Sequence, residues 1–93
     1  MIRSFACKET EKLFRGIRSR KLAQDMQERA VIKLAQIDAA VTVDDLRLPP
    51  SNHLELLSGK RAGQWSIRIN NQWRICFRFE ADGAHSVEIT DYH

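Results

Sequence analysis

The last residues of the sequence, "VEITDYH", bring together three side chains that could take part in acid–base chemistry. Asp91 is a carboxylate, Tyr92 is the only tyrosine, and His93 is one of three histidines in the chain. Histidine, with an unperturbed pKa of about 6.5, can donate or accept a proton near neutral pH. A nearby carboxylate would favour its protonated form, which suits a general acid. If the strand runs on, alternation places Tyr92 on the face of the preceding polar residues. Asp91 and His93 have the opposite parity, and the sequence leaves their direction open.

The stretch "QWSIRINNQWRICFRF" reads as two strands in which apolar and polar residues alternate, joined by a short loop. A two-residue turn would place Ile69 opposite Arg74 and mix the two faces. A three-residue loop over residues 70–72 pairs Ile69 with Trp73 and keeps the apolar face intact. We therefore expect the three-residue loop, with one of its two asparagines in the left-handed conformation.

This register places Arg68 directly opposite Arg74 on the polar face of the hairpin. Like charges that face each other across a strand pair are unfavourable by up to about 1 kcal/mol. Neighbouring carboxylates such as Glu80 or Glu88 could neutralise the pair. Alternatively, the two arginines bind an anion, and phosphate suits the forked guanidinium group especially well.

The elements that would hold these residues are read from the spacing of apolar side chains. Residues 2–6 alternate briefly and could form an edge strand, and residues 9–17 fit a short helix. A longer helix is predicted from an apolar stripe at steps of three and four: Leu22, Met26, Ala30, Leu34, Ile37 and Val41. Pro49 and Pro50 end the helical region, and strands are predicted over 53–57, 64–70, 73–79 and 86–91. This order indicates an α+β protein with helices on one face of an antiparallel sheet.

Length and composition predict one soluble domain over residues 1–93. Charged residues make up 29% of the chain and its net charge is +3, which permits an anionic partner without requiring one. No apolar run is long enough to span a membrane, so we expect a cytoplasmic protein with no membrane partner. Cys7 and Cys76 are expected to be buried, reduced thiols, and no ligand spacing predicts a metal site or another cofactor.

Four segments resemble the HigB-type toxins of the RelE/ParE toxin–antitoxin superfamily: "MIRSFACKETEKLF", "KLAQIDAAVTVDDLRLPP", "LSGKRAGQWSIRINNQWRICFRFE" and "VEITDYH". The likeness runs essentially from end to end. It implies a RelE-like fold, with an N-terminal edge strand and two main helices packed on one face of a mainly antiparallel, twisted sheet. It also implies the toxin of a type II pair, a ribosome-dependent, metal-free mRNA endonuclease that cleaves translated messages and arrests growth.

The partners implied by the resemblance are the ribosome, mRNA and a cognate helix-turn-helix antitoxin of the HigA type, with DNA bound only indirectly through that antitoxin. The catalytic residues implied by it are Asp91, Tyr92, His93, Arg68 and Arg74, the two arginines being phosphate ligands. Some relatives have a catalytic histidine where this chain has Glu55. This departure leaves open whether Glu55 serves as the base, whether the nearby His53 substitutes for it, or whether His93 works with fewer helpers.

Further basic residues could bind RNA or the ribosome, namely Lys60, Arg61 and Arg78. The earlier cluster of Arg15, Arg18, Arg20 and Lys21 is expected to be an ordinary solvated face. Two other functions remain open: a non-nuclease inhibitor of DNA gyrase, as in the related ParE branch, and a non-catalytic nucleic-acid-binding module. The terminal histidine and the paired arginines favour the nuclease over the gyrase inhibitor. The modest net charge and the lack of an aromatic stacking platform disfavour the binding module.

Overall fold

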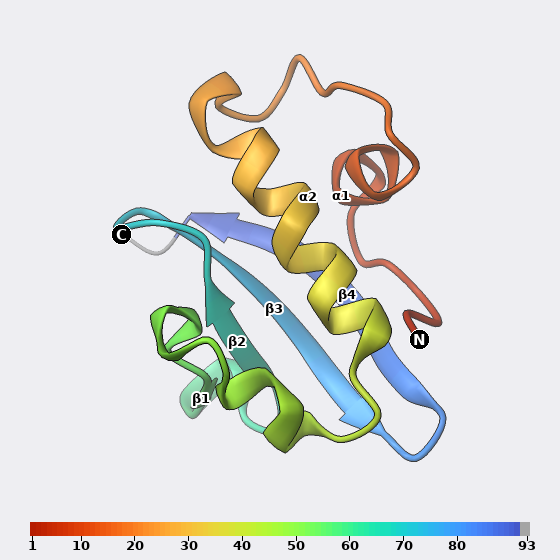
Figure 1. Ribbon diagram of the computed structural model, residues 1–93, viewed down its shortest axis with the longest axis vertical. Coiled ribbons are helices and arrows are strands. Elements are labelled where there is room, and N and C mark those ends of the chain that lie inside the picture. The colour runs from red at the N-terminus through yellow and green to blue at the C-terminus, as the bar shows by residue number, and fades with distance from the viewer. Residues whose placement is uncertain (92–93) are drawn as a thin grey trace.

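A computed structural model describes residues 1–91 of the chain. Two helices come first, α1 (Lys8–Phe14) and α2 (Gln24–Ala39). Three short 3-10 turns follow α2: η1 (Val43–Arg47), η2 (Pro50–Asn52) and η3 (Gly59–Arg61). The strands are β1 (Glu55–Leu56), β2 (Trp65–Arg68), β3 (Trp73–Glu80) and β4 (Gly83–Asp91). They form an antiparallel sheet in the order β1-β2-β3-β4, and α2 crosses one face of it with α1 alongside (Figure 1). The predicted α+β class is confirmed.

The N-terminal segment lies along the outer edge of β4. Ile2 and Phe5 form isolated parallel bridges to Ala84 and Val87, in place of a continuous edge strand. The chain can approach this closely because Gly83 has no side chain: a Cβ built there would lie 2.0 Å from the carbonyl oxygen of Met1. Since this segment runs parallel to β4, the sheet is mainly rather than wholly antiparallel.

The core lies between the helices and the sheet. The middle of the predicted apolar stripe is buried, in the order Met26, Ala30, Leu34 and Ile37. The two ends of the stripe depart from the prediction. Leu22 precedes the helix and is half-buried, and Val41 is 82% exposed because the helix ends at Ala39.

The first helix is shorter than predicted. It ends at Phe14, and Gly16 then takes a φ of +86°, a conformation that glycine adopts without steric cost. Ile17 is consequently outside the helix and 54% exposed, although the periodicity placed it on the apolar face. Cys7 was predicted to be buried, but it is half-buried. Cys76 is buried as predicted, and both thiols are free.

The hairpin register is confirmed, but the conformation of its loop is not. Ile67 pairs with Ile75, and the Ile69 N–H donates to the Trp73 carbonyl at 2.9 Å. Neither asparagine of the loop has a positive φ. Among residues 1–91, the non-glycine residues with a positive φ are His53 and Ser86. Instead the Asn70 side-chain oxygen accepts two loop N–H groups at 2.8 and 2.9 Å, and these bonds close the loop.

Candidate functional site

The face of the sheet opposite the helices carries polar residues from each of the four strands. Cross-strand pairing places Glu55, Ser66, Cys76 and Glu88 in one row and Arg68, Arg74 and Thr90 in the next. Side chains that alternate with core residues must point away from the core. The predicted pairing of Arg68 with Arg74 is therefore present, on the face that the helices leave open.

Arg74 is held from two sides. Its Nε donates to the hydroxyl of Ser66 at 2.8 Å, and a terminal nitrogen donates to the carbonyl oxygen of His53 at 2.7 Å. Ser66 is fully buried, so the hydroxyl is a fixed acceptor. These contacts use part of the guanidinium fork to orient it on the open face. Sequence reasoning did not identify Ser66, because a single serine in an alternating strand gives no signal of its own.

Arg68 is held by the loop that follows it. Its Nε donates to the Asn70 carbonyl at 3.2 Å, and a terminal nitrogen donates to the side-chain oxygen of Asn71. Within residues 1–91, no carboxylate forms an ion pair with Arg68. Glu88, one of the two carboxylates considered as neutralising partners, pairs with Arg61 at 2.9 Å. Neutralisation of Arg68 by Glu80 or Glu88 is thus not observed in this part of the chain.

The two arginines open onto a pocket of about 500 Å³, which we call the arginine pocket. Its lining residues are His53, Glu55, Arg68, Asn70, Asn71 and Arg74. The pocket thus brings together two candidate phosphate ligands and the two residues considered as the assisting base. One wall is conformationally unusual, since His53 has a φ of 45°. For a non-glycine residue this left-handed backbone conformation costs conformational energy, and it persists only where the surrounding structure stabilises it. Here the hydrogen bond from Arg74 to the His53 carbonyl contributes to that stabilisation.

The end of β4 lies beside the hairpin loop, and Asp91 is not among the residues that line the arginine pocket. Asp91 pairs with Trp73 in the sheet and accepts a hydrogen bond from the Gln72 side chain at 3.0 Å. Its position opposite Trp73 gives it the parity of the apolar face, as expected. Tyr92 and His93, two of the predicted catalytic residues, lie outside the residues that the structure describes.

The other predicted basic residues surround the open face. Lys60 and Arg61 lie in η3, and Arg61 reaches across to Glu88 of β4 while also donating to Gln64 at 3.0 Å. Arg78 is exposed and pairs with His85 beyond an irregularity in the β3–β4 ladder. Lys60 and Arg78 are exposed, whereas Arg61 is engaged in holding η3 against the sheet.

The described residues lack two further features, a metal-binding cluster and a membrane-spanning helix. Among residues 1–91, no three histidine, cysteine, aspartate or glutamate side chains come together as a metal site. No helix in the same range is long and apolar enough to cross a membrane.

Comparison with known protein sequences gives a consistent set of relatives. The family model described as "RelE-like toxin of type II toxin-antitoxin system HigB" matches residues 3–93. Endoribonuclease HigB of Proteus vulgaris is 37% identical over 94 aligned positions, which cover 100% of both chains. Toxin HigB-1 of Vibrio cholerae is 35% identical over 94 positions, covering 100% of this chain and 98% of that protein. A Haemophilus influenzae protein named only as uncharacterized is 40% identical over 67 residues, or 72% of this chain and 66% of that protein.

Comparison with solved structures concerns the fold. The YoeB-YefM complex from Staphylococcus aureus contains a chain that superposes with a TM-score of 0.59 and 20% sequence identity. The match covers 100% of this chain and 95% of that one. At this level of identity the likeness extends to the arrangement of helices and strands.

Proposed function

Because the chain belongs to the HigB-like family of RelE-like toxins of type II toxin–antitoxin systems, we propose that it is a ribosome-dependent, metal-free mRNA endonuclease that cleaves translated messages and arrests growth. The family assignment confirms the resemblance read from the sequence. The Proteus vulgaris relative is named an endoribonuclease, and the arginine pocket is suited to the same class of reaction.

The observation that carries the proposal is the pairing of Arg68 with Arg74 in a pocket that also contains Glu55. RNA cleavage without a metal ion begins when the 2′-hydroxyl attacks the adjacent phosphorus. Negative charge then accumulates on the phosphate oxygens, and guanidinium groups fixed beforehand can stabilise it. A well-placed donor of this kind typically contributes about 3–4 kcal/mol to transition-state stabilisation.

The same reaction needs two proton transfers. Glu55 is our choice for the base that removes the 2′-hydroxyl proton, with His53, on the same pocket wall, as the alternative. His93 is the general acid that protonates the departing 5′ oxygen, because an imidazolium releases a proton readily near neutral pH. Asp91 favours that protonated form, and Tyr92 stacks on an unpaired base. The products expected from this route are a 2′,3′-cyclic phosphate and a 5′-hydroxyl.

The partners follow from the same assignment. A toxin of a type II system is paired with an antitoxin. We assign a helix-turn-helix protein of the HigA type to this role, so the toxin would contact DNA only through it. The ribosome and mRNA are the remaining partners, with Lys60, Arg61 and Arg78 on the surface that meets RNA backbone. Such a toxin acts in the cytoplasm, where messages are translated.

The test is cleavage of a defined message on purified, programmed ribosomes. We expect cuts within the translated frame, fragments that end in a 2′,3′-cyclic phosphate, and no cutting of the same RNA without ribosomes. Fragments with a 3′-hydroxyl would instead indicate attack by an activated water. If the messages stay whole while DNA gyrase is inhibited in a parallel assay, the gyrase alternative replaces the proposal.

Variants then test the assigned residues. We expect His93→Ala and Arg74→Ala to lower the single-turnover cleavage rate by about 100-fold or more. Arg15→Ala is the matched control, because Arg15 is exposed and pairs only with Glu11 of α1 among the described contacts. If the two site variants cleave at the parental rate, the site is wrongly assigned even where the activity is present.

A further inference from the structure

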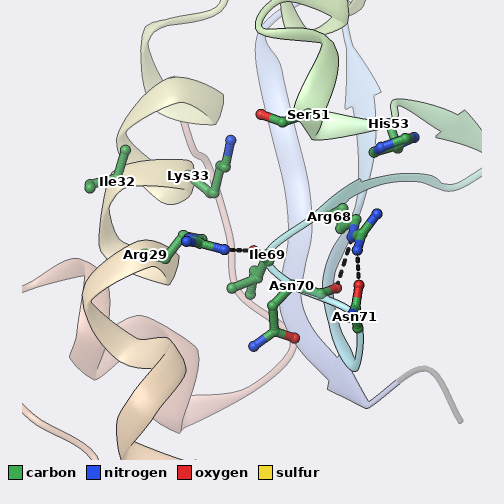
Figure 2. A pocket seen from close by; sticks show the side chains of 9 residues that line it. All are labelled: Arg29, Ile32, Lys33, Ser51, His53, Arg68, Ile69, Asn70 and Asn71. Atoms are coloured by element: carbon green, nitrogen blue, oxygen red, sulfur yellow. Dashed lines mark hydrogen bonds between the residues drawn. The ribbon is translucent and has the colours of Figure 1, made fainter.

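A second basic pocket lies between α2 and the β2–β3 loop. It has a volume of about 580 Å³, and we call it the α2 pocket. Figure 2 shows Arg29 and Lys33 extending from α2 on one side of it and Arg68 on the hairpin side. Its nine lining residues include these three cations and no aspartate or glutamate.

Lys33 adds a buried cationic side chain to this pocket. Its side chain is buried, with 7% of the residue exposed, and its ammonium donates to the Asn52 side chain, a neutral partner. Burial lowers the pKa of Lys33, and the positive charge of Arg29 lowers it further. A buried ammonium beside other cations is stabilised by an anion that enters the pocket.

Arg29 and Ile32 indicate what kind of anion the α2 pocket would bind. Arg29 is exposed, and its described side-chain contact is one long hydrogen bond of 3.4 Å to the Ile69 carbonyl (Figure 2). A guanidinium carries five N–H donors and forms forked pairs with phosphate. Ile32, 56% exposed, lines the same space and offers an apolar surface to a ribose or base edge.

The α2 pocket adjoins the arginine pocket. Four residues line both of them, namely His53, Arg68, Asn70 and Asn71. A strand whose scissile phosphate lies between Arg68 and Arg74 can therefore place a neighbouring phosphate beside Arg29. Because the two pockets share this wall, a single RNA strand that enters the arginine pocket can reach both of them. We therefore favour nucleic acid over an acidic protein segment as the occupant of the α2 pocket.

We propose that the α2 pocket is a second phosphate site, in which Arg29, Lys33 and Arg68 bind the RNA backbone next to the bond that is cut. This inference rests on the proposed nuclease function. Arg29 has a binding role in this proposal. Replacing its side chain should therefore lower the affinity for RNA and leave the rate of the chemical step largely unchanged.

The first test is kinetic, on programmed ribosomes under single-turnover conditions. For Arg29→Glu we expect the half-saturating toxin concentration to rise about tenfold, with the maximal rate within about twofold of the parent. Arg20→Glu is the matched control, because it makes the same change of charge at an exposed residue with no described side-chain hydrogen bond or ion pair. If Arg29→Glu behaves like Arg20→Glu, the inference is wrong while the nuclease function stands.

The second test does not depend on cleavage. A short single-stranded RNA with 2′-O-methyl groups is titrated into the isotope-labelled toxin, and amide resonances are followed by NMR. Shifts of Lys33 and Asn70 that disappear in Arg29→Ala support the site, even if the parent toxin cuts no message. The logarithmic salt dependence of binding should also lose about 0.7 in slope, as for one phosphate contact on a single strand.

Two results would overturn the inference in this second test. One is the absence of shifts at Lys33 and Asn70 in the parent protein at saturating RNA. The other is an Arg29→Glu variant that binds RNA normally but no longer binds its purified antitoxin, which would make the pocket a docking site for an acidic protein segment.

Discussion

Ser66→Ala tests whether the orientation of Arg74, beyond its charge, supports cleavage. The hydroxyl of Ser66 accepts from Arg74 Nε at 2.8 Å, and the His53 carbonyl accepts from the terminal nitrogen at 2.7 Å. Removing the hydroxyl leaves the second contact in place. The guanidinium therefore stays near the pocket but loses one of the bonds that fix its plane.

The size of the effect follows from two quantities. A hydrogen bond to a charged group contributes about 1.5–3 kcal/mol to stability, so Ser66→Ala should lower the free energy of unfolding by an amount in that range. If misorientation removes about half of the 3–4 kcal/mol that a well-placed donor supplies, the barrier rises by about 1.5–2 kcal/mol. Since each 1.4 kcal/mol is a factor of ten, the rate should fall about ten- to thirtyfold.

The assay is single-turnover cleavage on programmed ribosomes, accompanied by urea unfolding of each variant. Cys76→Ala is the matched control, because Cys76 is buried opposite Ser66 on the same face and takes no part in the described bonds of Arg74. It should lower stability without lowering the rate. In an Arg74→Ala background, Ser66→Ala should cause no further loss of rate. A parental rate in Ser66→Ala, or an equal loss in both backgrounds, would refute the reasoning.

Three further predictions concern stability. Asn52→Ala should lower the free energy of unfolding by about 3 kcal/mol in urea titrations, because the fully buried amide links α2 to η1 and its loss leaves the Lys33 ammonium without its acceptor. Asn70→Ala should cost about 1–2 kcal/mol, since two N–H groups of the hairpin loop lose their acceptor; an unchanged urea midpoint would contradict this role. Backbone N–H groups lower the pKa of Asp45, so its contribution to stability is present above a pH of about 4 and is lost as the pH falls through the folded pKa. Asp45→Asn should therefore flatten the acid side of a plot of urea midpoint against pH.

The strand pattern in the sequence was sufficient to predict the site's central feature. Alternation in the hairpin placed Arg68 opposite Arg74, because a two-residue turn would have shifted the register by one residue and mixed the apolar and polar faces. The middle of the α2 stripe was predictable for the same reason, since burial repeats with the helical period. The ends of elements were less predictable, as Val41 and Ile17 show, because a glycine or a change of chain direction removes a residue from the periodic surface.

The sequence by itself therefore determined the fold class, the hairpin register and the residue types available for phosphate chemistry. These features depend on short-range periodicity, which is written directly in the order of residues. Tertiary structure alone decided which partners each side chain meets. It brought the His53 carbonyl to Arg74, directed Glu88 to Arg61 and placed Arg29 of α2 beside the hairpin. Those contacts join residues far apart in the chain, and they depend on how loops and layers pack, which no local pattern encodes.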